Sequence, residues 1–273
     1  MILYAIVVAA GCLLASRGLI HYFQLESYQF PGYFRTLGRN WKRAWLPGVI
    51  IAAAVLIGSF FAQIAGNAVL KTLIVLCCMF IVLGALGHFQ LIAVQKAKKP
   101  LVFTPRIKRL YGVAAVVYVL ACWAMPWLWL FPVFLPLWVA LAGLLAWPIE
   151  KLISEMYFRD AQRMLKNRPD LIKIGITGSY GKTSVKFILG TMLQEKYQTL
   201  ITPSSFNTPM GVTKIIRTKL QPAHQVFVAE MGARHVGDIK EMCRLVHPHH
   251  GVLTSVGPQH LDTFKTLERI KKT

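Results

Sequence analysis

Three long stretches without a charged residue restrict the fold of this chain more than any other feature. They run from residue 44 to 70, from 72 to 95 and from 110 to 149. Because a helix needs about 20 mainly apolar residues to cross a bilayer, the last stretch is long enough for two crossings. Three prolines near its middle, among them Pro132, suit the turn that two crossings require. With the shorter uncharged segment 1–16, the sequence predicts five membrane-spanning helices within residues 1–148.

Lysine and arginine residues between these stretches predict the orientation of the helices, because cytoplasmic loops carry an excess of them. The first and third predicted loops are basic, with Arg17, Arg35, Arg39, Lys42 and Arg43 in one and Lys96, Lys98, Lys99, Arg106, Lys108 and Arg109 in the other. The N-terminus is therefore expected outside the cell, and everything after Pro148 in the cytoplasm. A cleaved signal peptide is the alternative interpretation of residues 1–16, although this segment lacks the usual basic start.

The net charge of +20 raises the question of a nucleic-acid partner. Much of this charge lies beside the predicted spans, where it sets the topology and meets anionic lipid headgroups. Because we find no DNA- or RNA-binding motif, we expect membrane lipid and no nucleic acid among the partners. Cys12, Cys77, Cys78 and Cys122 lie inside apolar stretches and Cys243 stands alone, so no disulfide framework is implied.

Residues 149–169 form a basic segment that follows the apolar part of the chain. Apolar residues recur at roughly helical spacing between Glu150 and Asn167, and Pro169 ends the pattern. The segment is predicted to be a linker helix. Two interpretations remain open: the helix lies on the inner membrane surface, or it extends the last spanning helix.

The sequence GITGSYGKTS at 175–184 is typical of a loop that holds nucleotide phosphates. Small residues let successive backbone amides face one point, Lys182 supplies a positive charge to the outer phosphates, and Thr183 offers a hydroxyl to Mg²⁺. Gly175 lies one residue too far from Gly181 for a standard Walker loop, so the usable pattern is the shorter GxxGKT. A glycine turn with a chance lysine is the alternative, but an apolar strand-like run before the loop and a helical run after it favour a nucleotide site. The residues predicted to bind ATP or GTP are Thr177, Gly178, Ser179, Tyr180, Gly181, Lys182, Thr183 and Ser184.

Residues 170–273 alternate strand-like and helical runs, which is the pattern of a parallel sheet with crossover helices. The predicted strands are 171–177, 198–201, 225–230 and 251–256. The predicted helices are 182–196, 210–220, 236–246 and 266–273. The fold class is thus a multi-span α-helical membrane region followed by an α/β P-loop domain with a mostly parallel sheet.

Two polar residues follow predicted strands at the edge where such folds bind ligands. Glu230 closes an apolar strand, and its carboxylate suits Mg²⁺, a cation that prefers oxygen. The alternative is an acid that merely caps the next turn. His260 follows the fourth strand; a histidine of this kind is more often a polar loop residue than a ligand, but its position opposite Glu230 makes it a candidate.

Two further groups carry weaker signals. Cys243 and His247 are four residues apart on a predicted helix, with His249 and His250 close behind, so a zinc site is conceivable. A second regularly spaced ligand pair is missing, which favours a polar turn instead. Ser204 and Ser205 lack a paired base and are expected to be loop residues.

Four ordered blocks resemble the central ATP-binding domain of the Mur ligase family. They are TGSYGKTS at 177–184, SSFNTPMGV at 204–212, AEMGARHVGDI at 229–239 and TSVGPQHLDTF at 254–264. The resemblance covers about 100 residues from Leu171 onward, and it is closest to the members that add a dipeptide to a UDP-muramoyl peptide. It implies an ATP-dependent amide ligase of bacterial cell-wall precursor synthesis, which activates a carboxylate as an acyl phosphate that an amine then attacks.

The resemblance also implies roles for individual residues. Lys182 and the backbone of 178–181 would hold the β- and γ-phosphates of ATP, Thr183 and Glu230 would bind Mg²⁺, and His260 would serve a second Mg²⁺. Lys182, Glu230 and His260 form the implied catalytic set. Asn207 and Thr208 match a loop that in relatives lies near the substrate and the transferred phosphate.

The chain also differs from the soluble members of this family. Membrane spans occupy the place of the domain that binds the UDP sugar. The domain that closes over ATP and binds the incoming amino acid or dipeptide lies outside these residues, so an N-terminal portion of a longer ligase is expected. The carbamoylated lysine of many relatives falls just past Thr273, or on Lys271 or Lys272 if the register slips. A poly-glutamate-type ligase and a non-catalytic nucleotide-binding membrane partner remain as alternatives.

Overall fold

The computed structural model describes residues 2–64, 70, 73, 77, 80–81, 84, 87, 100–124, 130–203 and 206–273. The chain divides into two compact units, Met1–Glu150 and Lys151–Thr273. Much of the predicted span 72–95, with Lys96, Lys98 and Lys99, lies outside the described residues, as do Cys78, Ser204 and Ser205.

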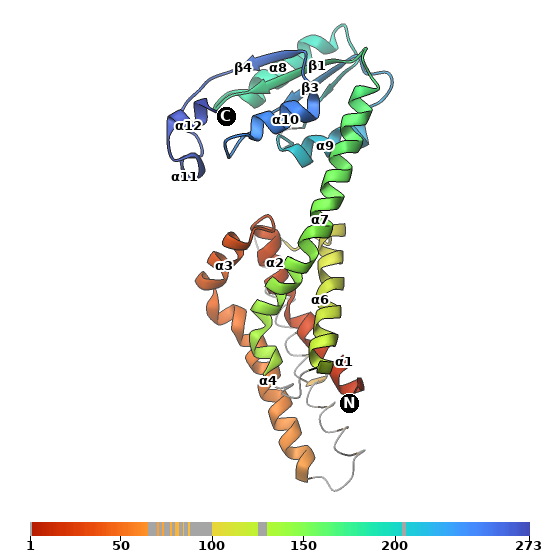
Figure 1. Cartoon of the computed structure of the whole chain (residues 1–273), viewed down its shortest axis with the longest axis vertical. Coiled ribbons are helices and arrows are strands. Elements are labelled where there is room, and N and C mark those ends of the chain that lie inside the picture. Colours follow the sequence, from red (N-terminus) through yellow and green to blue (C-terminus); the bar gives the residue numbers. More distant parts are fainter. Residues whose placement is uncertain are drawn as a thin grey trace. The chain divides into compact units, whose positions relative to one another are not determined.

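The first unit is helical (Figure 1). Its elements are α1 (Ile2–Ala15), α2 (Arg17–Leu25), α3 (Phe30–Arg39), α4 (Trp41–Ile64), α6 (Pro105–Ala124), the 3₁₀ turn η1 (Phe131–Phe134) and the first part of α7 (Leu135–Lys166). The predicted turn between two crossings in 110–149 corresponds to the break between α6 and α7, where Pro132 lies in η1. Proline suits this position because the ring removes a backbone donor and restricts the chain.

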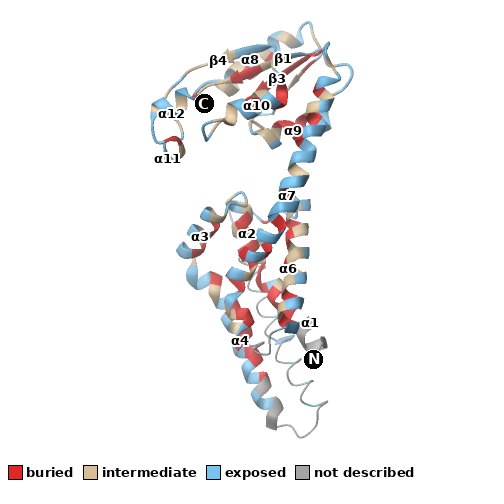
Figure 2. Cartoon of the chain, viewed as in Figure 1, coloured by how far each residue is buried: buried red, intermediate tan, exposed pale blue. Residues whose placement is uncertain are grey.

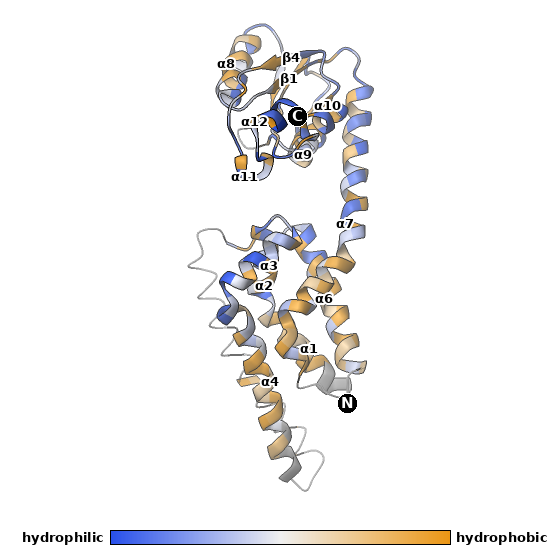
Figure 3. Cartoon of the chain, turned by 60° about the vertical axis from the view of Figure 1, so that its left-hand side comes forward, coloured by the Kyte–Doolittle hydropathy of each residue, from blue (hydrophilic) through white to orange (hydrophobic). Residues whose placement is uncertain are grey.

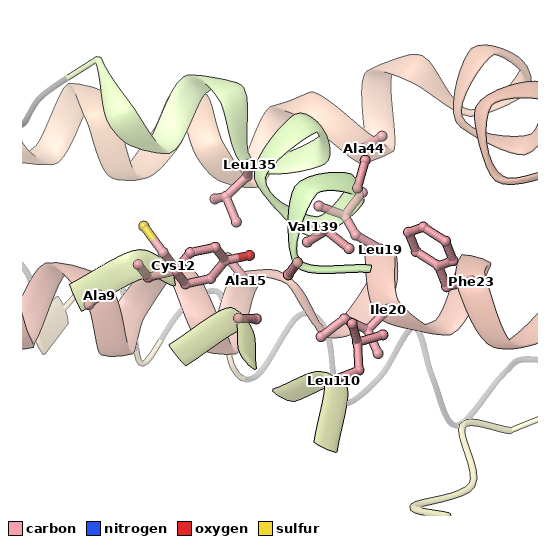
Figure 4. Close-up of a cluster of buried hydrophobic side chains, with 14 of the residues drawn as sticks. Ala9, Cys12, Ala15, Leu19, Ile20, Phe23, Ala44, Leu110, Leu135 and Val139 are labelled. Atoms are coloured by element: carbon pink, nitrogen blue, oxygen red, sulfur yellow. The ribbon is translucent and has the colours of Figure 1, made fainter. Parts of the chain in front are cut away.

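An apolar core joins the helices of this unit. Figure 4 shows side chains of α1, α2, α4, α6 and α7 that meet in it: Ala9, Cys12, Ala15, Leu19, Ile20, Phe23, Ala44, Leu110, Leu135 and Val139. Small residues on α1 allow close approach between helices, as is common where helices pack in a bilayer. The Tyr118 hydroxyl lies 2.6 Å from the Ser16 hydroxyl inside this core, so its polar atom is satisfied.

Three described helices are long and apolar enough to cross a membrane: Trp41–Gly58, Pro105–Ala124 and Phe131–Lys166. The pair Ile6–Ala15 and Arg17–Leu25, bent by 42°, would make a fourth if it counts as one broken span. Figure 3 shows hydrophobic residues over α1, α4 and α6. Within the described residues these helices account for four of the five predicted spans at most, and crossing of a membrane stays a prediction.

The predicted first loop is more structured than expected. This loop between predicted spans contains α2 and α3, and Phe23 of α2 stacks on Tyr33 of α3 with ring centroids 4.1 Å apart. The Tyr33 hydroxyl donates a hydrogen bond to the carbonyl of Pro136 at 2.8 Å. The prediction of a loop used only the positions of the basic residues, so it did not include the packing of Phe23 and Tyr33.

The predicted linker helix is the continuation of α7, which runs unbroken from Leu135 through Pro148 to Lys166. This is the second of the two interpretations left open by the sequence, a helical extension of the preceding apolar segment. Its last turns carry Phe158, Ala161 and Leu165, which are buried in the core of the second unit.

The second unit is built on a four-stranded parallel sheet with the order β2-β3-β1-β4. The strands are β1 (Ile172–Thr177), β2 (Thr199–Ile201), β3 (Val226–Glu230) and β4 (His250–Leu253). All four coincide with predicted strands, and the predicted α/β fold with a parallel sheet is confirmed. The predicted fourth strand is shorter than expected, since the chain leaves the sheet after Leu253.

Helices cover both faces of this sheet (Figure 1). On one face Val226 and Val228 pack with α8 (Lys182–Gln194), and on the other Phe227 and Ala229 pack with α9 (Pro209–Lys219), α10 (Asp238–Val246) and the end of α7. Figure 2 shows the buried residues along the strands. Because β3 is covered on both faces, all five of its residues are buried, as expected for an inner parallel strand.

The final predicted helix, 266–273, corresponds to α12 (Leu267–Lys271), and a further short helix that was not predicted, α11 (Leu261–Phe264), precedes it. The two helices are separated by Lys265, which has a φ of 70°. Positive φ is unfavourable for a residue with a side chain, so the two helices do not continue through this position. Asp238 begins α10 two residues later than predicted, because Gly237 with a φ of 98° precedes it.

Candidate functional site

The glycine loop connects β1 directly to α8 at the carboxyl edge of the sheet. Gly178 has a φ of 138° and Gly181 a φ of 80°, values that only glycine adopts readily. A Cβ at Gly178 would collide with the Thr254 hydroxyl and the backbone of Ser255, whereas a Cβ at Gly181 would meet open space. The predicted strand–loop–helix context is therefore present, with open space beside the second glycine.

The segment that follows β4 holds this loop in place. The amide of Ser179 donates to the carbonyl of Ser255 at 2.7 Å, and the amide of Tyr180 donates to the Ser255 hydroxyl at 3.0 Å. The Ser179 hydroxyl donates to the carbonyl of Gly257 at 2.8 Å. Two of the amides expected to face phosphate are thus engaged within the protein, which corrects the expectation that the backbone of 178–181 as a whole forms the phosphate cradle.

The backbone amides that are available to an anion lie just after these two residues, at the start of α8. Within the described residues, the structure records no acceptor for the backbone amides of residues 181–184. Gly181 is the N-cap of α8 and no side chain caps this helix. Free amides at a helix N-terminus, together with the positive end of the helix dipole, form an anion-binding site.

Lys182 lies in the first turn of α8 and folds over the loop. Its ammonium donates to the carbonyls of Gly178 at 2.5 Å and Ser179 at 3.0 Å. Partial burial lowers the pKa of Lys182 below its usual value, and the neighbouring Glu230 carboxylate opposes this shift. The ammonium is thus held beside the free amides by neutral carbonyls.

Glu230 ends β3, next to Ile176 of β1 in the sheet register, and its carboxylate is surrounded by polar side chains. The Thr183 hydroxyl lies 3.2 and 3.1 Å from its Oε1 and Oε2, and the Asn207 amide donates to Oε1 at 3.3 Å. The Lys186 ammonium donates to Oε2 at 2.7 Å. The side chains of Thr183, Glu230 and Asn207 predicted for the metal and the substrate are therefore brought together.

Lys186 was missed by the sequence analysis. Its side chain is fully buried, and that of Glu230 is 2% exposed. The signal that could have found it is its spacing: Lys186 is four residues after Lys182, which places both on one face of α8. A lysine in this position pairs with the acid that ends the neighbouring strand.

The residues present fit a magnesium ion, although the full ligand set is only partly assembled. The Thr183 hydroxyl and the Glu230 carboxylate supply the hard oxygen donors that Mg²⁺ prefers. His260 is exposed and starts α11 with a φ of 52°, and it is not among the recorded partners of the Glu230 carboxylate. Its predicted role thus stays a prediction.

Asn207 and Thr208 lie in different surroundings. The Thr208 hydroxyl accepts a hydrogen bond from the amide of Gly211 at 3.2 Å and caps α9. The carbonyl of Asn207 accepts from the amide of Gly232 at 2.8 Å, which ties its loop to the end of β3. Asn207 therefore faces the site, while the Thr208 side chain has a structural role in the helix.

The weaker zinc hypothesis finds no support. Among the residues that the structure describes, no group of three or more His, Cys, Asp or Glu side chains could hold a metal ion. His249 instead accepts a hydrogen bond at Nδ1 from the amide of Lys173 at 3.2 Å, and His247 ends α10 with a φ of 47°. The polar turn ahead of β4 is the better description.

The fold and the site together define an α/β domain with an anion-binding helix N-terminus beside a buried acid. Comparison with known proteins shows which family this domain is similar to. Residues 176–273 match the model of the Mur ligase middle domain. The match confirms the predicted resemblance for that segment.

Two curated enzymes and one solved structure are similar to this chain in sequence. The chain is 32% identical over 105 residues to UDP-N-acetylmuramoyl-tripeptide--D-alanyl-D-alanine ligase of Treponema pallidum, covering 38% of this chain and 23% of that protein. It is 36% identical over 101 residues to the enzyme of the same name from Mycobacterium tuberculosis, covering 37% of this chain and 19% of that protein. The crystal structure of MurF ligase from Thermotoga maritima in complex with ADP is 35% identical, with 44% of this chain and 28% of that chain covered and a TM-score of 0.42. The chain spans about a quarter or less of the length of these curated relatives.

Proposed function

We propose that this chain belongs to a membrane-anchored, ATP-dependent amide ligase that acts on a UDP-muramoyl peptide of bacterial cell-wall synthesis. The observation that carries the proposal is the arrangement around Glu230: the acid meets Thr183 and Asn207 beside the free amides of residues 181–184. A site of this kind suits a nucleoside triphosphate and its bound Mg²⁺. The similarity of residues 176–273 to the Mur ligase middle domain supports the same activity.

Each side chain has a defined task in this proposal. The amides of 181–184 and the Lys182 ammonium hold the β- and γ-phosphates of ATP and stabilise the charge that develops as the γ-phosphoryl group leaves. Thr183 and Glu230 would hold Mg²⁺, which neutralises phosphate charge when bound. Asn207 donates to the Glu230 carboxylate and would lie beside the bound substrate.

The reaction proposed for the whole protein has two steps. A substrate carboxylate attacks the γ-phosphorus of ATP, which gives an acyl phosphate and ADP. An incoming amine, from D-alanyl-D-alanine or another amino acid or dipeptide, then attacks the acyl carbon, and inorganic phosphate leaves as the amide forms. His260 is kept as a proposed ligand of a second Mg²⁺.

The apolar first unit supports a location at the bacterial cell membrane, with the second unit in the cytoplasm where ATP is found. Four described helical segments at most meet the length and composition of a span, and basic residues flank them. Membrane lipid is accordingly a proposed partner of the first unit. Cysteine labelling of Cys243 in intact and permeabilised cells tests this orientation, and labelling from outside would contradict it.

Phosphate release by the full-length protein tests the activity. With UDP-muramoyl tripeptide, D-alanyl-D-alanine and ATP, we expect release of one phosphate for each amide formed. Turnover with glutamate in place of these substrates would instead favour a poly-glutamate-type ligase. Nucleotide binding without phosphate release under either condition would favour a non-catalytic membrane partner.

A further inference from the structure

The buried ion pair between Lys186 and Glu230 has no role in the reaction as described so far. The two side chains meet at 2.7 Å and are 0% and 2% exposed. Burial of two charges costs free energy that their attraction only partly recovers, so such a pair is weak evidence for stability alone. Because the ion pair includes Glu230, the proposed metal ligand, it suggests a role in metal binding.

The contacts of the two carboxylate oxygens are unequal. The Lys186 ammonium donates to Oε2 at 2.7 Å, and the Asn207 amide donates to Oε1 at 3.3 Å. The Thr183 hydroxyl lies between the two oxygens, 3.2 Å from Oε1 and 3.1 Å from Oε2. A charged hydrogen bond of 2.7 Å is the strongest of these interactions. Lys186 therefore fixes the rotation of the carboxylate and occupies one of its oxygens.

We propose that Lys186 is a positioning residue that makes Glu230 a one-oxygen ligand and thereby selects Mg²⁺ over Ca²⁺. A cation bound at Oε2 would lie beside the positive charge of the Lys186 ammonium, whereas the contacts of Oε1 come from the neutral Thr183 and Asn207 side chains, so Oε1 is the oxygen that favours a cation. Mg²⁺ requires a compact octahedral set of ligands at 2.0–2.1 Å, whereas Ca²⁺ takes six to eight oxygens at longer distances and often binds both oxygens of one carboxylate. This inference rests on the proposed nucleotide and metal site, and it adds a reason why that site would prefer Mg²⁺ to Ca²⁺.

The test compares metal-dependent nucleotide binding in the full chain in detergent. A fluorescent ATP analogue is titrated in Mg²⁺ and in Ca²⁺, and the ratio of the two dissociation constants is measured for the unaltered protein and for Lys186→Met. We expect the preference for Mg²⁺ to fall by about tenfold in Lys186→Met, an effect of the size seen when a partner of a metal ligand is removed. Lys186→Gln, which retains a hydrogen-bond donor for Oε2, should keep more of the preference.

Lys173→Met is the matched control, because Lys173 is also buried in this unit but has no recorded contact with Glu230. A merely structural effect would weaken binding in both metals alike and leave the ratio unchanged. An unchanged ratio in folded Lys186→Met would overturn the inference. No binding by the unaltered protein in Mg²⁺ would instead contradict the proposed nucleotide site itself.

A measurement on the unaltered protein covers the case in which Lys186→Met does not fold. Infrared difference spectra of the Mg²⁺ and Ca²⁺ complexes with the ATP analogue report the splitting of the carboxylate stretching bands, and Glu230→Gln identifies the bands of Glu230. We expect the splitting of a one-oxygen ligand with both cations. Two-oxygen coordination of Ca²⁺ by Glu230 would contradict the proposal.

Discussion

The two units of this protein bury charge to different depths. In the described part of the first unit, the core is apolar, and its buried acid, Glu150, is paired with Arg109 at 2.6 Å beyond the long apolar run of α7. The second unit instead brings charge into its interior, with Lys186 and Glu230 at the carboxyl edge of the sheet. Apolar packing thus provides the architecture of the first unit, while the second retains costly buried charge where its proposed chemistry takes place.

Breaking the buried pair should have the largest effect on stability. Glu230→Ala leaves the Lys186 ammonium buried without its partner, so we expect the free energy of unfolding of the second unit to fall by about 3–5 kcal/mol. Pulse proteolysis in urea measures this loss on the full chain. The double variant Glu230→Ala/Lys186→Met should recover a large part of it, and a double variant no more stable than Glu230→Ala would show that the pair is not the cause.

A substitution in the glycine loop should have the next largest effect. Gly178→Ala forces a side chain into a φ of 138° and against Thr254 and Ser255, so we expect a loss of about 1–3 kcal/mol. Gly181→Ala meets open space at a φ of 80° and should cost only about 1 kcal/mol. Unfolding of the two variants in parallel measures the difference, and equal losses would argue against the close contact with the segment after β4.

The smallest effect is expected in the first unit. Tyr118→Phe removes the hydroxyl that lies 2.6 Å from the Ser16 hydroxyl, which also donates to the carbonyl of Cys12 at 2.7 Å. Because Ser16 keeps a partner and hydrogen bonds between helices in lipid are worth about 0.6 kcal/mol on average, the loss should be close to that value. Thermal unfolding in detergent measures it. A loss as large as that of Glu230→Ala would contradict the contrast between the two units.

The sequence predicts the second unit better than the first. All four strands, Thr183 and Glu230 follow from local patterns, because in a parallel sheet the strand ends lie at one edge and the motifs mark those ends. Asn207 was predicted only through the family resemblance. Lys186 and Ser255 could not be assigned in this way, since their roles depend on which strands are neighbours in space. The engagement of the Ser179 and Tyr180 amides by Ser255 is a contact between residues about 75 positions apart.

In the first unit, composition predicts apolar helices but not their packing. Residues 17–39, which contain α2 and α3, were assigned only to a loop between spans, because that prediction used the positions of the basic residues and not those of the aromatic residues. Which side of α2 and α3 is buried depends on partners such as Pro136, about 100 residues away. Hydropathy therefore identifies candidate spans, whereas helices that carry both charge and buried aromatic residues require the structure.

The central claim is that the amides of residues 181–184 and the Lys182 ammonium hold nucleotide phosphates. Titration of the full chain with a fluorescent ATP analogue in Mg²⁺ tests it most directly, with Lys182→Ala against Lys196→Ala, an exposed lysine beyond the end of α8. We expect Lys182→Ala to lose about 10- to 100-fold in affinity, the worth of a hydrogen bond to a charged group, and Lys196→Ala to bind as the unaltered protein does. Equal affinity of all three proteins would contradict the account.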